Sequence, residues 1–156
     1  MQIQLVAVGT RMPSWVDDGY QEYARRLPRE CALRLTEIPL AQRSRSRPLE
    51  RLVEEEGKRM LAATSPGQRI IALDVKGKSW STEHLAGQLR EWMQDGQNVS
   101  LLVGGPDGLS ADCLNQARQR WSLSDLTLPH PLVRVLLAEQ LYRAWTITTG
   151  HPYHRS

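Results

Sequence analysis

The first eight residues of the chain, MQIQLVAV, place apolar side chains on both faces of an extended strand. Ile3, Leu5 and Ala7 fall on one face, and Val6 and Val8 fall on the other. A strand that is apolar on both faces is typical of the interior of a sheet that is covered on both sides. The N-terminal segment is therefore predicted to be a central strand.

The rest of the chain alternates between helical and extended patterns. Apolar residues at helical spacing, together with stop residues such as Pro28, Gly96 and Gly150, delimit the segments. The predicted helices cover residues 14–27, 49–63, 81–95, 110–121 and 131–149, and the further strands cover residues 33–38, 70–74, 99–103 and 126–128. This alternation indicates an α/β fold, with a mostly parallel sheet and flanking helices.

The composition is that of an ordinary globular domain. The chain has 156 residues, of which 40% are hydrophobic and 24% charged, and we expect one domain over residues 1–156. No run approaches the ~18 apolar residues of a membrane helix, and the N-terminus lacks the basic segment of a signal peptide. We therefore expect a cytoplasmic protein with no membrane partner. Cys31 and Cys113 lack metal-site spacing, and we expect both to be reduced and half-buried.

The basic residues are mostly arginine, 17 against 3 lysines, and the formal net charge is +3. Arginine suits bidentate phosphate contacts and stacking on bases, which favours an RNA partner. A genome rich in arginine codons explains the same count equally well. Residues 41–48, AQRSRSRP, are predicted to form a mobile loop that buries no apolar area. The arginines of this loop, Arg43, Arg45 and Arg47, either contact an RNA backbone or are simply solvated.

A glycine-rich segment, LVGGPDG at residues 102–108, follows a predicted buried strand and precedes a helix. In open α/β sheets, ligands bind at the carboxyl ends of the strands, and glycine lets a ligand approach the backbone closely. The segment has neither the Gly-Lys-Ser/Thr of a phosphate-binding loop nor a GxGxxG pattern, so neither ATP nor a dinucleotide is indicated. The alternative is a tight turn without a ligand.

His130 lies between two prolines, Pro129 and Pro131. Pro131 disfavours helical geometry at His130 and is well placed as the first residue of the last helix. His130 then lies at the positive end of a helix dipole, which favours a neutral imidazole that can accept a proton or a hydrogen bond. The alternative is a histidine that only caps the helix or packs at a turn.

The last predicted helix has an unusually wide apolar face. It includes Leu132, Val133, Leu136, Leu137, Leu141, Ala144, Trp145 and Ile147. This width indicates burial on more than one side, either in the core or against a partner subunit. Glu139 and Arg143 stand at i,i+4 in the favourable order for a helical ion pair.

The tail that follows, GHPYHRS at residues 150–156, permits two interpretations. Chain ends are usually frayed and inert. This one, however, is dense in groups that stack on bases, form hydrogen bonds and neutralise phosphate, which is typical of an RNA contact.

Seven segments carry a resemblance that covers essentially the whole chain. They are Leu5–Gly9, Leu73-Asp74, Leu102–Gly108, Ser122–His130, Arg134, Glu139–Ala144 and His151–Arg155. In this order they resemble the bacterial large-subunit (23S) ribosomal RNA pseudouridine N3-methyltransferases of the SPOUT superfamily. No single motif is highly specific, but the ordered set is.

The resemblance implies more than the spacing does. It implies a SPOUT-like domain whose C-terminal part forms a deep trefoil knot, although chains as a rule do not knot. It implies S-adenosyl-L-methionine as the cofactor and 23S ribosomal RNA, in the assembled ribosome, as the substrate. It also implies a homodimer in which the tail of one subunit completes the site of the other.

Two sets of site residues follow from the same resemblance. The cofactor would be held, chiefly through backbone groups, by Leu73, Gly104, Gly105, Leu123, Ser124, Asp125, Leu126, Thr127 and Leu128. The positions near the target base are His130, Tyr153, His154 and Arg155.

The chemistry of pseudouridine N3 methylation fits these residues. A methyl sulfonium is already activated, so the reaction needs no metal, and the chain has no metal-binding spacing. The N3 imide proton must leave, and cationic or hydrogen-bonding groups would stabilise the resulting anion. Arg155 and one of the histidines are candidates, while the proton acceptor stays open. The alternative function is a catalytically inactive ribosome-binding or assembly factor of the same fold, which would have no need to keep a cofactor pocket.

Overall fold

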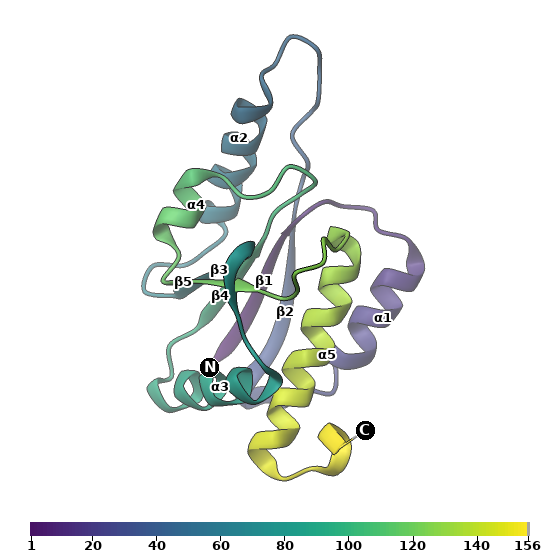
Figure 1. Ribbon diagram of the computed structural model, residues 1–156, viewed down its shortest axis with the longest axis vertical. Helices are drawn as coiled ribbons and strands as arrows, with labels where there is room; N and C mark the ends of the chain where they lie inside the picture. The colour runs from purple at the N-terminus through teal and green to yellow at the C-terminus, as the bar shows by residue number, and fades with distance from the viewer. Residues whose placement is uncertain (156) are drawn as a thin grey trace.

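The computed structural model describes residues 1–155, and its centre is a five-stranded parallel sheet (Figure 1). The strands are β1 (Gln2–Val8), β2 (Ala32–Ile38), β3 (Arg69–Ser79), β4 (Val99–Val103) and β5 (Gln119–Ser122). Their order is β2-β1-β4-β3-β5, and every pair is parallel. The predicted α/β fold class is confirmed, and β1 is a central strand as expected.

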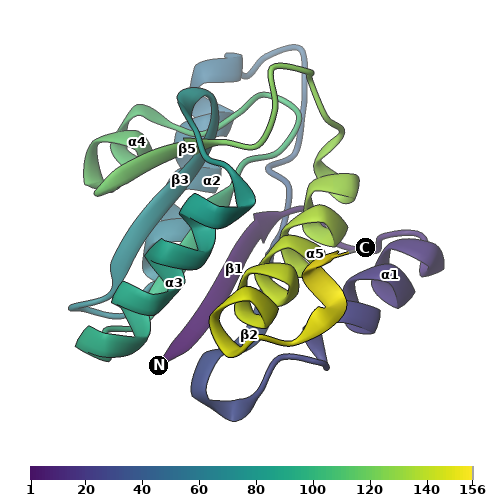
Figure 2. The same ribbon diagram turned by 60° about the horizontal axis from the view of Figure 1, so that its bottom comes forward.

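Helices cover both faces of this sheet. They are α1 (Ser14–Ala24), α2 (Leu49–Ala62), α3 (Thr82–Asp95), α4 (Ala111–Gln116) and α5 (His130–Thr149), with short 3-10 turns η1 (Arg29–Cys31) and η2 (Pro152–Arg155). Helices α1, α3 and α5 pack on the face of Ile3, Leu5 and Ala7. Helices α2 and α4 pack on the face of Val6 and Val8, so that α2 lies behind the sheet in Figure 2.

Local sequence explains several helix boundaries. The Ser81 hydroxyl accepts a hydrogen bond from the His84 amide and caps α3, which ends at Gly96 in the left-handed conformation. Helix α5 ends the same way at Gly150, with φ +73°. Its start differs from the prediction by one residue. Pro129 is the extended residue before the helix, and His130 is already helical.

Two predictions in the second half of the chain are wrong. The helix predicted to reach residue 121 ends at Gln116, and residues 119–122 form β5 instead. The ring of Trp121 stacks on Trp80 at 4.6 Å, and β5 pairs with the long strand β3, so distant packing overrides the local pattern. Residues 126–128, predicted as a strand, form a loop in which Leu126 is 73% exposed and covers no sheet.

Smaller corrections concern burial. Both cysteines are free, as expected, but fully buried rather than half-buried. In the 41–48 segment Ala41 is buried, so the expectation that the segment buries no apolar area is wrong. Over residues 1–155, no helix is both long and apolar enough to cross a membrane. The trefoil knot implied by the resemblance stays a prediction.

Candidate functional site

A cavity of about 940 Å³ opens at the carboxyl ends of β4 and β5, beside residues 73–76 in the middle of β3. This is the edge of a parallel sheet where ligands of α/β proteins bind. Three segments supply most of its wall: one lies within β3, and the other two follow β4 and β5. The lining residues are 73–76, 103–106, 108–109, 114, 120–121, 123–124, 126–130 and 133.

Most of the predicted cofactor residues line this one cavity. They are Leu73, Gly104, Gly105, Leu123, Ser124, Leu126, Thr127 and Leu128. The ninth, Asp125, is exposed and does not line it. Of the four residues predicted near the target base, His130 lines the cavity and the three tail residues do not.

The 104–108 segment is a turn closed on itself. The Gly108 amide donates a hydrogen bond to the Gly105 carbonyl at 3.1 Å, and Gly108 has φ +82°. A Cβ atom on Gly104 would lie 2.6 Å from the Gly108 carbonyl carbon. Glycine at positions 104 and 108 is therefore required by the turn itself. The segment is therefore a tight turn, and the same turn lines the cavity.

The 123–128 loop is held by short-range side-chain bonds. The Ser122 hydroxyl donates to the Ser124 carbonyl at 3.1 Å, and the Ser124 hydroxyl accepts from the Leu126 amide at 2.9 Å. Bonds of this kind stabilise a loop that belongs to neither sheet nor helix. The loop leads through Pro129 into α5, and so places His130 at the cavity.

His130 is half-buried in the cavity wall, one helical turn before Arg134. Burial, and then the nearby Arg134 guanidinium, lower the pKa of the His130 imidazole. The direction agrees with the prediction from the helix dipole, although burial is the larger cause. Arg134 is itself 1% exposed, donates to the Gly9 carbonyl at 2.8 Å and pairs with Glu37 at 2.7 Å. The wall of the cavity therefore carries an imidazole whose protonated form is disfavoured, and the fixed Arg134 cation lies just outside the lining residues.

This lowered pKa predicts a specific dependence of stability on pH. Below the ordinary histidine value of 6.5, the unfolded chain binds a proton at His130 that the folded protein does not, so the free energy of unfolding falls. We expect the melting temperature of the wild type to drop more than that of His130→Gln between about pH 8 and about pH 5. Parallel curves for the two proteins would contradict this assignment.

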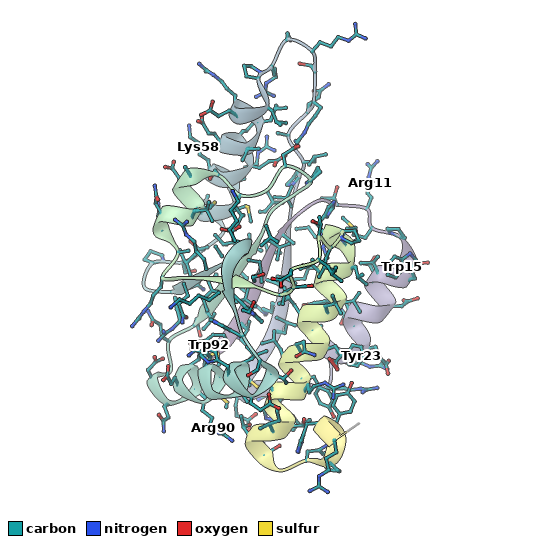
Figure 3. All side chains as sticks on the ribbon, viewed as in Figure 1. Arg11, Trp15, Tyr23, Lys58, Arg90 and Trp92 are labelled. Carbon is teal, nitrogen blue, oxygen red and sulfur yellow. The ribbon has the colours of Figure 1, made fainter. Side chains whose placement is uncertain are left out.

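The tail lies at the other end of α5 from His130 (Figure 1). A helix of 20 residues is about 30 Å long, so one chain cannot bring the tail to its own cavity. The Tyr153 hydroxyl donates to Glu139 at 3.0 Å, and its ring packs on Tyr142 at 4.7 Å. Tyr23 of α1 lies beside this end of α5 (Figure 3). The tail is therefore docked rather than frayed.

The tail residues differ in exposure. Burial, followed by the bond to Glu139, raises the pKa of Tyr153 to about 12. Tyr153 and His154 are half-buried, whereas Arg155 is exposed. Glu139 also pairs with Arg143 at 2.9 Å, which confirms the predicted helical ion pair. Ser156 lies outside the described residues.

The arginines of the 41–48 segment do not share one environment. Arg43 pairs with Glu56 and Asp107, and Arg47 pairs with Glu55 at 2.6 Å. Arg45 is exposed. Two of the three arginines that were considered for RNA contact are therefore bound to carboxylates of the same chain.

Sequence reasoning missed several residues of the cavity. Asp74, Lys76, Arg120 and Trp121 line it, and the side chains of the first three are charged. Asp74 and Lys76 stand at or just beyond the end of the predicted strand over residues 70–74, so the rule on carboxyl ends would have found them. Arg120 and Trp121 were hidden by the wrong helix over 110–121. Among residues 1–155, no group of three or more His, Cys, Asp or Glu is placed to hold a metal ion.

The fold and this cavity define an α/β protein with a large cavity at the carboxyl edge of its sheet. A family model described as "Predicted SPOUT methyltransferase" matches residues 1–154. The chain belongs to this family.

The chain is also similar to curated relatives and solved structures that are named as methyltransferases or methylases. "Ribosomal RNA large subunit methyltransferase H" of Azotobacter vinelandii is 57% identical and covers 99% of this chain and 100% of that protein. The protein of the same name from Methylococcus capsulatus is 59% identical over the same shares. A solved "probable methylase family protein" from Haemophilus influenzae has a TM-score of 0.58 and 12% identity, and covers 97% of this chain and 69% of that one. This last likeness concerns the fold alone.

Proposed function

We propose that this chain methylates N3 of a pseudouridine in 23S ribosomal RNA, with S-adenosyl-L-methionine as the methyl donor. The observation that carries the proposal is the cavity, because one space brings together the 73–76, 103–109 and 123–130 segments. The near-full-length similarity to large-subunit ribosomal RNA methyltransferases supports the choice of substrate. The proposal takes residues 1–156 as one SPOUT-like methyltransferase domain that acts in the cytoplasm.

The residues of the cavity fit the proposed cofactor. A volume of about 940 Å³ is at the upper end of the range for small-molecule sites, which leaves room for a cofactor and a nucleobase. Leu73, Leu109 and Leu114 give an apolar wall for an adenine ring. Asp74 is the acid among the lining residues and suits a ligand that carries a sulfonium and an ammonium group. When bound, S-adenosyl-L-methionine supplies a methyl group on a positively charged sulfur, which is already activated for transfer.

The side chains of the protein then position the base and manage its proton. His130 provides a ring nitrogen at the cavity, and its lowered pKa favours the neutral form, which can accept a hydrogen bond or the imide proton. Arg155 provides a planar cation that can stabilise the imide anion. Tyr153 and His154 offer rings and hydrogen-bonding groups for the nucleotide. Alignment of N3 with the methyl group supplies much of the acceleration.

The proposed enzyme is a homodimer. The tail is proposed to act at the cavity, but the tail and the cavity of one chain lie at opposite ends of α5. A second copy can lend its tail to this cavity. The wide apolar face of α5 supports dimerisation less strongly than the sequence suggested. Leu137, Leu141 and Ala144 are buried in the core of the same chain, so they need no partner.

We expect the protein to sediment as a dimer at micromolar concentration. The expected mass is about twice 17.7 kDa. A folded monomer would contradict the shared site. Trp145→Asp is a poor test of dimerisation, because Trp145 packs against the core of its own chain and the variant perturbs the fold.

The direct test of function is the modification itself. Mass spectrometry of 23S ribosomal RNA from a strain that lacks this protein should show one pseudouridine without its N3 methyl group. Purified protein and S-adenosyl-L-methionine should restore the methyl group on ribosomes from that strain. Ribosome binding without methyl transfer would indicate the inactive assembly factor instead.

A further inference from the structure

The turn at residues 104–108 is held from outside by an ion-pair network that runs from the buried Glu56 to the exposed Asp107. Arg43 donates a hydrogen bond from one guanidinium nitrogen to Glu56 and from the other to Asp107, the latter at 2.6 Å. Asp107 stands within the turn, whereas Glu56 is on α2. One arginine from the segment before α2 therefore joins a helix to the wall of the cavity, across 64 residues of sequence.

The Glu56 end of this network is fixed. Glu56 is 2% exposed, accepts a hydrogen bond from the Ala41 amide at 3.0 Å and pairs with Arg43. Arg43 also donates to the Ala41 carbonyl at 2.8 Å, which fixes the start of its own segment. A buried carboxylate is costly without its cation, so the pair with Arg43 is stable in the folded protein.

A second contact joins the same two segments. A Cβ atom on Gly105 would lie 3.4 Å from the Leu40 side chain and 3.0 Å from Val8. The segment around residues 40–43 thus packs on Gly105 and binds Asp107. Because the turn is closed internally by the bond from Gly108 to Gly105, it moves as one body when Asp107 is held.

The next part of the chain is also attached to α2. A Cβ atom on Gly57 would lie 2.2 Å from the Ser110 hydroxyl, which shows how closely α2 approaches the start of α4. The Cys113 thiol donates to the Gly57 carbonyl at 3.6 Å. Helix α2 therefore fixes α4 through Gly57. It also fixes the turn at residues 104–108 through Glu56 and Arg43.

We propose that Arg43 is a positioning residue for the cofactor: through Asp107 it sets where the Gly104–Gly108 wall of the cavity stands. This inference rests on the proposed function, since it assumes that the cavity takes S-adenosyl-L-methionine. Arg43 and Asp107 do not line the cavity, so they act through the turn and not by contact. The inference also assigns Arg43 a role other than the RNA contact considered from the sequence.

The test uses Asp107→Ala in the full-length protein. Asp107 is an exposed residue, so its removal leaves Glu56 paired with Arg43 and the melting temperature close to that of the wild type. The dissociation constant of S-adenosyl-L-methionine, measured by calorimetry, should rise about five- to tenfold, or about 1–1.4 kcal/mol. The methylation rate at saturating cofactor should not change, because a bound cofactor restores the turn.

Glu55→Gln is the matched control. Glu55 lies on α2 beside Glu56 and pairs with Arg47 and Arg59, and its side chain is about as exposed as that of Asp107, 34% against 27%. Removal of this charge from the same region should leave the cofactor dissociation constant unchanged. A rise equal to that of Asp107→Ala would show a general charge effect and overturn the inference.

A second variant tests the bridge from its other side. Arg43→Lys keeps a cation beside Glu56, but a lysine cannot bond two carboxylates as a planar guanidinium does. In the double variant Arg43→Lys/Asp107→Ala, the dissociation constant of the cofactor should be no higher than in the single variant that binds it more weakly.

The outcomes separate the two proposals. Wild-type affinity in Asp107→Ala, or fully additive losses in the double variant, would overturn the role of Arg43 while the proposed function stands. Failure of the wild-type protein to bind S-adenosyl-L-methionine would overturn the proposed cofactor, and this inference with it.

Discussion

Replacing Gly104 by alanine will cost the protein its binding of S-adenosyl-L-methionine. The new methyl carbon would lie 2.6 Å from the Gly108 carbonyl carbon and 2.7 Å from its oxygen. Both atoms belong to the backbone, so no side-chain rotation relieves the clash, and the turn must open. Because the turn is a wall of the cavity, we expect the dissociation constant to rise by about 100-fold or more, roughly 2.7 kcal/mol. Valine at this position should act at least as strongly.

Gly87→Ala is the control of matched size. Gly87 lies in α3, and a Cβ atom there meets nothing within 4 Å, so the added methyl group is accommodated. Calorimetry should give wild-type affinity for this control. Circular dichroism should show that Gly104→Ala keeps the sheet folded, because the cores on both faces are untouched. Cofactor binding by Gly104→Ala at wild-type strength would place the cofactor site elsewhere.

The same glycine shows how far the sequence alone can go. A glycine-rich segment after a buried strand pointed to a ligand site, and the structure puts that segment at the cavity. The physical reason given for Gly104 was different, however. Sequence reasoning expected glycine there to let a ligand approach the backbone, whereas the structure shows that a side chain would clash within the turn. A backbone contact between residues four apart depends on dihedral angles that the pattern does not reveal.

Several predictions that rested on local physics were accurate. The two-faced apolar pattern of residues 1–8 identified the central strand, and Ser81 and Gly96 marked the ends of α3. Predictions that depended on distant partners were not. Strand β5 exists because it pairs with β3, about 50 residues earlier in the chain, and the contact of Arg43 with Asp107 spans 64 residues. Neither partner is visible in a local window.

The separation of His130 from the tail was predictable in principle. A helix expected over 131–149 is rigid and about 28 Å long, so the segments at its two ends cannot meet in one chain. The docking of the tail was not predictable, because it depends on Tyr142 and Glu139 facing Tyr153 after the chain turns at Gly150. These two facts shape the last prediction.

Deleting residues 152–156 will leave the protein folded, dimeric and able to bind S-adenosyl-L-methionine, while methyl transfer falls by about 100-fold or more. The deletion removes contacts of Tyr153 with Glu139 and Tyr142, but the buried residues of α5 and the whole cavity remain. The loss therefore concerns alignment of the base and stabilisation of its anion, which act on the transition state. Single-turnover methylation of unmodified ribosomes measures the rate, and calorimetry measures cofactor affinity in parallel.

Arg155→Lys narrows the effect to one group. A lysine keeps the charge but loses the planar fork, so the rate should fall, although less than after the deletion. Arg90→Lys is the control, since Arg90 is an exposed arginine on α3 (Figure 3). Full activity of the truncated protein would refute a catalytic role of the tail. A large loss of cofactor affinity would mean instead that the tail closes the cofactor pocket.

Mixed dimers decide whether the tail acts on the partner's cavity. A His130→Ala subunit with an intact tail is co-expressed with a truncated subunit that keeps His130, and two affinity tags select the heterodimer. If each tail serves the other subunit, one cavity of this dimer has both His130 and a tail, while the second cavity has neither. The heterodimer should then recover about half of the wild-type rate, far above both parent homodimers, in which every cavity lacks either His130 or a tail. Helix α5 is too long for His130 and the tail of the same chain to meet, so any joint action of the two must occur across the subunits. A heterodimer no more active than its parents would therefore contradict the shared site.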